Sequence, residues 1–220
     1  MSDTSTEAGS LTLTAAARTF FRFPTPRILA PLAVGAVALR LALGDFRLAD
    51  LVIPAVILGL EPFTEWTIHV LLLHFKPRTF RGHRIDPLVA REHRAHHRDP
   101  RDLPLVFIPL PVLIVSVIVG AAAYLLAFAG LRQAITALAV SYSMLFAYEW
   151  THYLIHTAYR PRTHFYRYVW RAHRLHHFKN EHYWFGVTVH LADHVLRTFP
   201  AKEAVETSPT ARTLGVEEAA

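Results

Sequence analysis

The amino-acid sequence predicts an all-α integral membrane protein, in which a bundle of four transmembrane helices carries a helical cap at its cytoplasmic end. Three observations predict this fold. Of the 220 residues, 52% are hydrophobic and only 18% are charged, whereas a soluble domain usually carries about 25% charged residues. The hydrophobic residues form four long, nearly uninterrupted segments. The loops between them alternate between weakly charged and strongly basic.

The four apolar segments cover residues 28–43, 51–75, 103–129 and 134–158. A transmembrane helix needs about 20 apolar residues, so the last three segments are long enough, and the first is marginal. A short turn around Gly130 predicts that the third and fourth segments form a tight helical hairpin. A soluble bundle of hydrophobic helices is the alternative, but apolar runs of this length are typical of membrane spans.

The chain is short enough for a single membrane domain, which we place at residues 28–200. A polar and basic N-terminal segment, residues 1–27, precedes it, and a flexible tail, residues 201–220, is expected to follow it. The N-terminal segment lacks the apolar core and small-residue cleavage site of a secretory signal. The sequence contains no cysteine, which excludes disulfides, iron–sulfur clusters and thiol nucleophiles.

The basic residues predict the orientation of the helices. Residues 76–101 contain eight Lys or Arg and residues 159–179 contain six, whereas the opposite end has three arginines, partly offset by Asp45 and Asp50. The positive-inside rule then places both basic stretches and both termini in the cytoplasm, and we expect the cell's inner membrane. Topology and attraction to anionic headgroups explain these stretches, so no nucleic-acid partner is predicted.

The sequence contains an internal repeat, over about residues 61–101 and 145–181. Each copy reads EWT and then PRT twelve residues later, with a pair of histidines in between. Each copy continues with the motif R-x-H-R-x-H-H, first as REHRAHH and then as RAHRLHH. Matching blocks in the same order predict a pseudo-twofold arrangement that brings the histidines of both copies to one place.

The spacing of these histidines indicates shared helix faces. In each triplet the histidines lie at i, i+3 and i+4, and the second pair, His152 and His156, lies at i and i+4, so each set shares one face. His69 and His74 lie at i and i+5, which a regular helix would separate by about 140°. A one-residue π-bulge or an early helix end would bring them together. The first copy indeed has one extra residue, Ile68, before its histidine.

We therefore predict that ten histidines are metal ligands. Gathered imidazoles repel one another when protonated, whereas several neutral imidazoles can share a cation. Ten ligands are too many for one ion of four to six coordination, so the cap is predicted to hold a dinuclear site, although imidazole suits zinc, copper, iron and nickel. The predicted ligands are His69, His74, His93, His96, His97, His152, His156, His173, His176 and His177.

The other five histidines fit no repeated spacing. His83, His164 and His182 stand alone, while His190 and His194 lie at i and i+4. This last pair is spaced to bind a metal, but we expect it to line or border the predicted site.

Two functions of other classes are alternatives to an enzyme with a dinuclear metal site. A membrane zinc hydrolase is disfavoured because the sequence has no HExxH motif and because ten histidines exceed the three protein ligands of a hydrolytic zinc site. A metal transporter or metal-binding protein is disfavoured because transport sites lie near mid-membrane, whereas these histidines gather at one end of the spans. Metal content and O2 consumption distinguish the three.

The blocks HVLLLH, HRAHH, HYLIH and HRLHH together resemble those of the fatty acid hydroxylase/sterol desaturase superfamily of integral-membrane di-iron enzymes, over about residues 61–200. The block at 176–188, followed by Asp193, is similar to the C-terminal block of the fatty acyl hydroxylases. The sequence departs from the family pattern at Ala192, before that acid, and at Arg197 and Thr198, after it.

The resemblance implies the chemistry. The ten histidines would hold two iron ions, which zinc can replace in purified protein, and O2 would be the co-substrate. No catalytic residue beyond the metal ligands is implied. The reaction would hydroxylate or desaturate the alkyl chain of a lipid, either a fatty acid or a fatty acyl lipid, with sterols or carotenoids as the alternative substrates.

Three acids are expected to support the ligands from behind. Asp193 is predicted to accept a ring N–H from a ligand histidine, with an ion pair to Arg197 as the alternative. Glu65 and Glu149 lie one turn before the two histidine pairs, and buried carboxylates in spans are usually partnered. They are expected to bind ligand histidines or the arginines of the opposing triplet.

The electron supply is expected to come from another protein. The sequence contains neither a GxGxxG motif nor a haem-attachment CxxCH motif. We predict a separate donor, a ferredoxin or a cytochrome of the b5 type, that docks on the basic cytoplasmic face.

Overall fold

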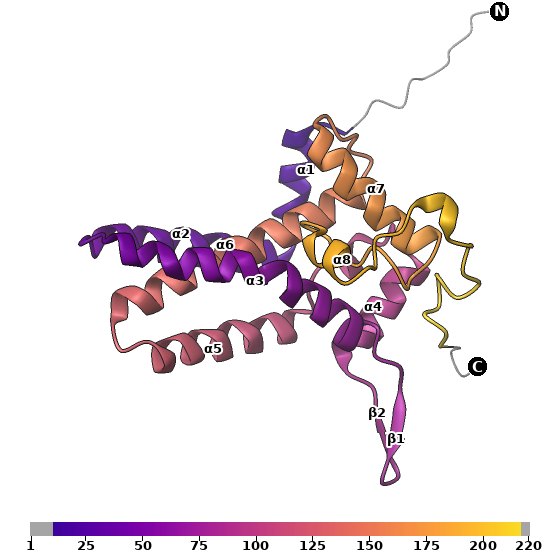
Figure 1. Ribbon diagram of the computed structural model, residues 1–220, viewed down its shortest axis with the longest axis horizontal. Helices are drawn as coiled ribbons and strands as arrows, with labels where there is room; N and C mark the ends of the chain where they lie inside the picture. Colours follow the sequence, from indigo (N-terminus) through magenta and orange to yellow (C-terminus); the bar gives the residue numbers. More distant parts are fainter. Residues whose placement is uncertain (1–10, 217–220) are drawn as a thin grey trace, which may run out of the picture.

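The computed structural model describes residues 11–216, and within this part the chain is helical apart from one two-stranded hairpin. Residues 1–10 of the predicted N-terminal segment and residues 217–220 of the predicted tail lie outside the described residues. Four long helices lie side by side, and the shorter helices gather at one of their ends (Figure 1).

The long helices are α2 (Pro24–Ala42), α3 (Val52–Ile68), α5 (Leu110–Ala127) and α6 (Leu131–Ile155). The α6 helix packs against the other three. α2 begins before the predicted segment because prolines are tolerated in the first turn of a helix. α5 and α6 are joined by a short connection, which confirms the predicted helical hairpin.

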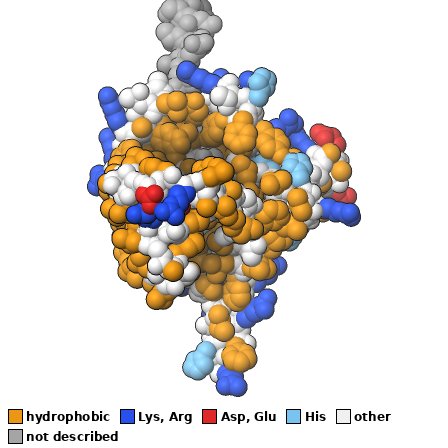
Figure 2. Space-filling model, turned by 60° about the vertical axis from the view of Figure 1, so that its left-hand side comes forward, with side chains coloured by type: hydrophobic (Ala, Val, Ile, Leu, Met, Phe, Trp, Pro, Cys, Tyr) orange, Lys and Arg blue, Asp and Glu red, His pale blue; other side chains and the backbone are white. Residues whose placement is uncertain are grey.

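Within residues 11–216, three helical stretches are long and apolar enough to cross a membrane: Pro24–Ala42, Leu48–Leu73 and Leu103–Ala127. Hydrophobic side chains cover much of the bundle surface in Figure 2. α6 is not among the three, although it coincides with the fourth predicted span. Much of α6 is buried against its neighbours, and a helix shielded from lipid does not need an apolar surface on every side. The fourth span therefore stays a prediction.

A polar cluster at the end of the bundle far from the short helices explains why an arginine interrupts the first apolar segment. The guanidinium of Arg40 donates to the Thr136 hydroxyl at 2.8 Å and lies 3.0 Å from a carboxylate oxygen of Asp50. Arg132 of α6 pairs with Asp45 in the same loop. A charge next to the bilayer is tolerated when it is paired in this way.

The short helices form the other end of the molecule. They are α1 (Leu13–Phe20), α4 (Leu88–Arg98), α7 (His164–Phe178) and α8 (Leu191–Val195), with 3-10 turns at Leu103–Val106 and Lys202–Ala204, whereas the 3-10 turn at Leu48–Leu51 precedes α3 at the opposite end. α1 is fixed to the end of α6 because the fully buried ring of Phe20 packs against Trp150 and Tyr153, with centroid distances of 5.0 and 5.3 Å. The strands β1 (Arg78–Phe80) and β2 (His83–Ile85) connect α3 to α4 as an antiparallel hairpin.

Residues 201–216 differ from the flexible tail that the sequence predicts. Val205 is buried in a cluster with Trp184 and Ala172, and the guanidinium of Arg212 donates to the main-chain oxygen of His97 at 2.8 Å. The segment has no periodic hydrophobic pattern, so its order comes from contacts with distant parts of the chain.

Candidate metal centre

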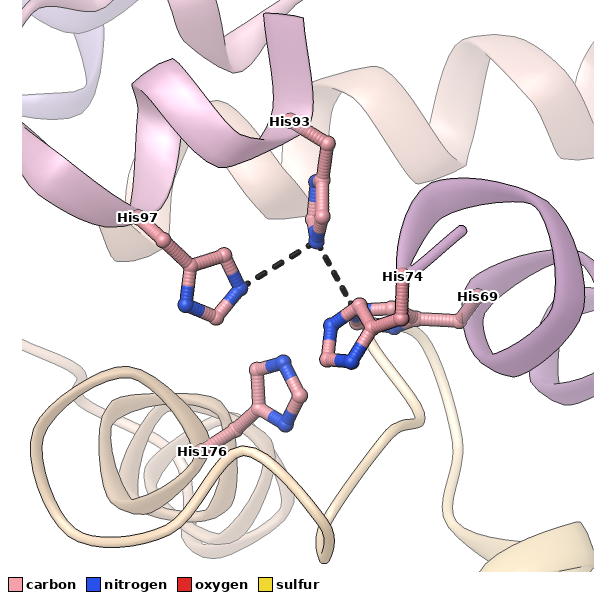
Figure 3. A group of neighbouring side chains, drawn as sticks. All are labelled: His69, His74, His93, His97 and His176. Carbon is pink, nitrogen blue, oxygen red and sulfur yellow. Dashed lines mark hydrogen bonds between the residues drawn. The ribbon is translucent and has the colours of Figure 1, made fainter. Parts of the chain in front are cut away.

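The structure brings all ten predicted histidines together in two groups of five. In each group, one ring nitrogen of every histidine lies within 4.8 Å of the others, and eight of the ten side chains are buried. The first group, drawn in Figure 3, is His69, His74, His93, His97 and His176, and the second is His96, His152, His156, His173 and His177.

The two groups are assembled from the two halves of the repeat in the same way. Each contains the histidine pair at the end of one long helix and the first and third histidines of the triplet that follows it. The fifth member is the middle histidine of the opposite triplet, so that His96 of α4 completes the second group and His176 of α7 completes the first. The two halves of the repeat therefore exchange one side chain each, and neither half contains a complete group.

A π-helical turn positions the first pair. The stretch His69–Leu73 is π-helical, and the backbone N–H of His74 donates to the carbonyl of His69 at 3.1 Å. This wider turn accommodates the extra residue in the i, i+5 spacing. The structure confirms the predicted π-bulge, whereas His152 and His156 lie on the regular end of α6.

Amphipathic helices position the two triplets. The buried face of α4 carries His93, His96 and His97, and the buried face of α7 carries the corresponding three histidines. Thr163 caps α7 by accepting the backbone N–H of Tyr166 at 3.2 Å. The i, i+3, i+4 spacing thus places each triplet on one side of a helix, as the sequence predicts.

Backbone carbonyls fix the orientation of several rings. The Nδ1–H groups of His69, His97, His152 and His176 donate to the carbonyls of Phe185, Ala211, Val106 and Tyr183, at 2.6–2.9 Å. Because a carbonyl oxygen only accepts, each of these rings carries its proton on Nδ1 and presents the Nε2 lone pair to the group interior. Metal-ligating histidines are usually held in this way.

The buried nitrogens that remain fit a cation. The Nε2 atom of His93 lies 3.2 Å from the Nε2 atoms of both His69 and His97, and both of those atoms carry lone pairs. A single proton on His93 cannot satisfy both acceptors. Six of the ten histidines also have a buried ring nitrogen with no hydrogen-bond partner. Such convergent lone pairs are costly to bury without a partner.

The spacing of the nitrogens gives a second test of the fit. Adjacent Nε2 atoms are 3.0–3.2 Å apart in both groups. Imidazole nitrogen lies about 2.0–2.1 Å from zinc, and two ligands at right angles around such an ion are then about 3.0 Å apart. The residues present therefore suit one metal ion in each group.

The two groups are neighbours, and burial lowers the pKa of the rings where they meet. The rings of His97 and His177, one from each group, stack with centroids 4.1 Å apart. Burial lowers the pKa of His97 to about 3, and burial together with adjacent imidazoles holds the pKa of His177 well below its usual range. Neutral imidazole is the form that binds metal.

Glu65 and Glu149 do not contact ligand histidines or the triplet arginines; they hold the loops that follow the opposite triplets. Glu65 accepts the backbone N–H groups of Val187 and Thr188 and the Thr188 hydroxyl. Glu149 accepts the backbone N–H of Ile108 at 3.1 Å. The carbonyls that accept from His69 and His152 belong to Phe185 and Val106, and each of these residues lies two positions before the first N–H that the carboxylate binds.

Asp193 is fully buried, and the ring that it binds is His190, which belongs to neither group, at 2.9 Å. It also accepts the backbone N–H groups of Phe185 and Gly186, at 3.0 and 2.8 Å, and the Thr198 hydroxyl at 2.6 Å. Asp193 therefore acts on His69 through the Phe185 backbone, and not by direct contact as the sequence predicts. Nothing in the structure pairs it with the Arg197 side chain among the described residues.

The five remaining histidines lie outside both groups. His190 and His194 are held by Asp193 and by the Tyr168 hydroxyl, respectively. His83 and His164 are exposed, and exposed His182 lies 3.5 Å from Glu181.

The structure adds supporting groups that the sequence does not reveal. The carbonyls of Phe185, Ala211, Val106 and Tyr183 orient ligand rings, but every residue has a carbonyl, so no side-chain signal marks them. The Phe185 ring also lies beside the first group, 5.5 Å from the His69 ring and 5.4 Å from the His176 ring. The repeated Trp66 donates to the Thr198 hydroxyl at 2.9 Å, which ties α3 to the Asp193 network.

Comparisons with known proteins agree with this geometry. The sequence model of the fatty acid hydroxylase family matches residues 54–198. The dihydroceramide fatty acyl 2-hydroxylase FAH2 of Arabidopsis thaliana is 31% identical over 144 residues, which are 64% of this chain and 57% of that protein. The fatty acid 2-hydroxylase of Rattus norvegicus is 32% identical over 154 residues, which are 67% of this chain and 40% of that protein.

One solved structure, described as full-length scs7p with only the hydroxylase domain visible, shares the fold. Its TM-score is 0.65 at 24% identity, and the match covers 83% of this chain and 68% of that chain. The chain spans less than two thirds of the length of the two curated relatives.

Proposed function

Since the chain belongs to the fatty acid hydroxylase family, we propose that it is an O2-dependent di-iron oxidoreductase that hydroxylates the alkyl chain of a membrane lipid. Its three apolar helices fit an integral membrane protein. The observation that carries the proposal is the pair of five-histidine groups, buried side by side at one end of the long helices.

The proposed substrate is a fatty acid or a fatty acyl lipid, and the proposed site of oxidation is carbon 2. Two lines support this. The curated relatives named above are 2-hydroxylases. The histidine groups also begin where α3 and α6 end, a depth at which a lipid headgroup meets its acyl chain. Carbon 2 is the first methylene beyond the acyl carbonyl, so it lies at that depth.

The overall reaction fixes what must be supplied. The substrate C–H bond is replaced by C–OH, while the second oxygen atom leaves as water, which consumes one O2, two electrons and two protons. Two bound iron ions would supply the activation of O2 that the organic side chains cannot perform. Zinc binds imidazole readily, so its presence in purified protein would reflect substitution.

The chain's own residues hold and shield this chemistry. The ten histidines would supply neutral nitrogen ligands, and the carbonyls behind them would keep the rings in place. Burial of the groups excludes water, so that reactive species do not escape into solvent. Phe185 presents an apolar ring beside the first group. This ring suits contact with an alkyl chain better than contact with a polar substrate.

The proposed topology has four spanning helices, with α6 as the fourth. The histidine groups, the cap and both termini then lie on the cytoplasmic side, because residues 76–101 and 159–179 carry the basic charge. A separate donor, a ferredoxin or a cytochrome of the b5 type, would deliver electrons to this basic face. The proposed location is the inner membrane.

Isotope labelling tests the function directly. Protein loaded with iron is reduced, supplied with a fatty acyl lipid, and exposed to 18O2, and the products are analysed by mass spectrometry. We expect two irons per chain and one 18O atom in a 2-hydroxyacyl product. Ester or peptide cleavage without O2, with a single zinc per chain, would overturn the proposal in favour of a hydrolase.

Substitution of one ligand in each group tests the assignment of the site. We expect His97→Ala and His177→Ala each to abolish product and to lower metal content. His182→Ala is the matched control, since this exposed histidine lies outside both groups, and it should retain both. Full activity in either ligand variant would contradict the assignment.

A further inference from the structure

The β1–β2 hairpin has an exposed surface whose partner the fold does not supply. Arg78 pairs with Ile85, and Phe80 pairs with His83. Arg81 and Gly82 form the turn, both with positive φ (49° and 79°), which is the two-residue turn that matches the twist of a hairpin. All six strand residues are exposed. A lone two-stranded hairpin is only marginally stable in water, so a partner surface is expected.

One face of the hairpin is apolar and basic at once. Side chains alternate along a strand, so Arg78, Phe80, His83 and Ile85 share a face. Phe80 is 60% exposed and Ile85 is 43% exposed. The guanidinium of Arg81 lies 5.3 Å from the centre of the Phe80 ring, which places a cation at the edge of the apolar pair.

The charge of this segment is of one sign. Residues 76–85 contain Lys76 and three arginines but no acid. The next acid, Asp86, lies 2.6 Å from Arg94 of α4 and 3.4 Å from Arg84. Arg84 belongs to the face opposite Phe80, so these ion pairs link the opposite face to the cap. Among the described residues, no ion pair joins an acid to the Phe80 face.

The hairpin also lies where the apolar surface of the bundle ends. It begins five residues after Leu73, the last residue of the second membrane-spanning candidate. In Figure 1 it runs across the direction of the long helices and away from them. Figure 2 shows basic, histidine and hydrophobic side chains together on this projection. An element placed in this way would extend along a membrane surface.

We propose that the hairpin binds the lipid surface, with Phe80 and Ile85 entering the cytoplasmic leaflet and the arginines contacting anionic headgroups. Interfacial segments combine insertion of apolar residues, Phe among them, with electrostatic attraction to acidic lipids. An acidic protein would satisfy the arginines, but it would leave the apolar pair and the position beside the span unexplained. The inference rests on the cytoplasmic placement under Proposed function.

The absence of cysteine from the sequence allows a label to be placed at a single position. Phe80→Cys and Thr79→Cys, on opposite faces of the same strand, are each labelled with an environment-sensitive fluorophore. The full-length labelled proteins are reconstituted in vesicles of phosphatidylcholine with or without phosphatidylglycerol. Quenching is measured with nitroxide-labelled lipid and with aqueous iodide.

We expect the label at position 80 to show blue-shifted emission and roughly twofold stronger lipid quenching than the label at position 79. This difference should increase in vesicles that contain phosphatidylglycerol, and the paired substitution Arg78→Gln and Arg81→Gln should reduce the increase. Equal, iodide-dominated quenching at both positions would overturn the inference. A response at position 80 only when an acidic ferredoxin or cytochrome is added would overturn it in favour of protein docking.

The same samples separate this inference from the proposed function. Metal content and 18O incorporation are measured on each labelled protein. Normal turnover with a solvent-exposed label at position 80 would refute the lipid-binding hairpin alone. A membrane-inserted label without turnover would count against the proposed function alone.

Discussion

At the scale of single residues, the candidate metal centre includes groups that lie behind the ten histidines and fix their rings. Four histidine rings are fixed through Nδ1 by main-chain carbonyls. Two of those carbonyls lie in loops whose backbone N–H groups donate to Glu65 and Glu149. The orientation of a ligand ring is thus set by a carboxylate that never touches it. Neither carboxylate would bind metal in this arrangement.

The exchanged histidines give the first prediction. His96→Ala, on α4, should weaken metal binding mainly at the group formed by α6 and α7, and His176→Ala should do so at the group formed by α3 and α4, because each ring completes the opposite group. Loss of a group that merely supports a ligand costs about 10–100-fold in metal affinity, and loss of a ligand should cost at least as much. Metal titration of each variant, with His182→Ala as control, measures this. Weakening confined to the variant's own half would contradict the exchange.

The carboxylates give the second prediction. Glu65→Gln keeps the size of the side chain but replaces one accepting oxygen with an NH2 group that donates. That NH2 group would face groups that are themselves donors, since two backbone N–H groups and the Thr188 hydroxyl donate to Glu65. We expect about 10-fold weaker metal binding at the first group, because the Phe185 carbonyl behind His69 becomes mobile. Glu149→Gln should have a smaller effect at the second group, because the amide keeps one oxygen to accept the single N–H that Glu149 binds, that of Ile108. Unchanged metal affinity in both variants would show that the loops hold their positions without the carboxylates.

At the scale of elements, the internal repeat made local geometry predictable. The mismatch between the i, i+5 and i, i+4 histidine pairs predicted the π-bulge, and the i, i+3, i+4 triplets predicted the buried faces of α4 and α7. The exchange of His96 and His176 was not predictable, because spacing within one helix does not determine which neighbour that helix faces. The β1–β2 hairpin and the packing of residues 201–216 were not predicted either, since both segments are short and lack a periodic hydrophobic pattern.

The π-helical turn gives the third prediction. Leu71 is 65% exposed, so its deletion removes no core contact and converts the first pair to the i, i+4 spacing of the second. We expect the deletion variant to retain metal at both groups, because a regular helix also places i and i+4 on one face. Insertion of one alanine after Val70 should abolish binding at the first group, since it rotates His74 by a further 100° or so. Metal stoichiometry compares the two variants, and the reverse order of tolerance would contradict the role assigned to the turn.

At the scale of the whole molecule, the candidate metal centre brings together segments that are far apart in the sequence. The ten histidines come from α4, α7, the end of α6 and the π-helical turn that follows α3, and residues 201–216 contact α4 through His97. Bound metal should therefore stabilise the entire cap and not one helix.

The fourth prediction concerns metal removal. A ligand that binds only the folded state at 100 times its dissociation constant contributes about 2.7 kcal/mol, and each kcal/mol shifts the melting temperature of a chain of this size by about 2–4 °C. Chelation of one ion should then lower the melting temperature by about 5–11 °C, and restoration of iron should reverse the loss. Measurement of the unfolding temperature in detergent tests this, with chelator added to the His97→Ala, His177→Ala double variant as the control. An unchanged melting temperature would show that the cap is stable without metal.

The exchange of middle histidines has a consequence for how the protein is made. Translation proceeds from the N-terminus, so the first four members of the first group are available long before His176 leaves the ribosome. The first group therefore lacks its fifth histidine until most of the chain has been synthesised. Ala211, whose carbonyl accepts from His97, is synthesised later still. If the groups bind metal as proposed, an ion delivered during synthesis would meet an incomplete group, and we expect metal loading to follow synthesis of most of the chain.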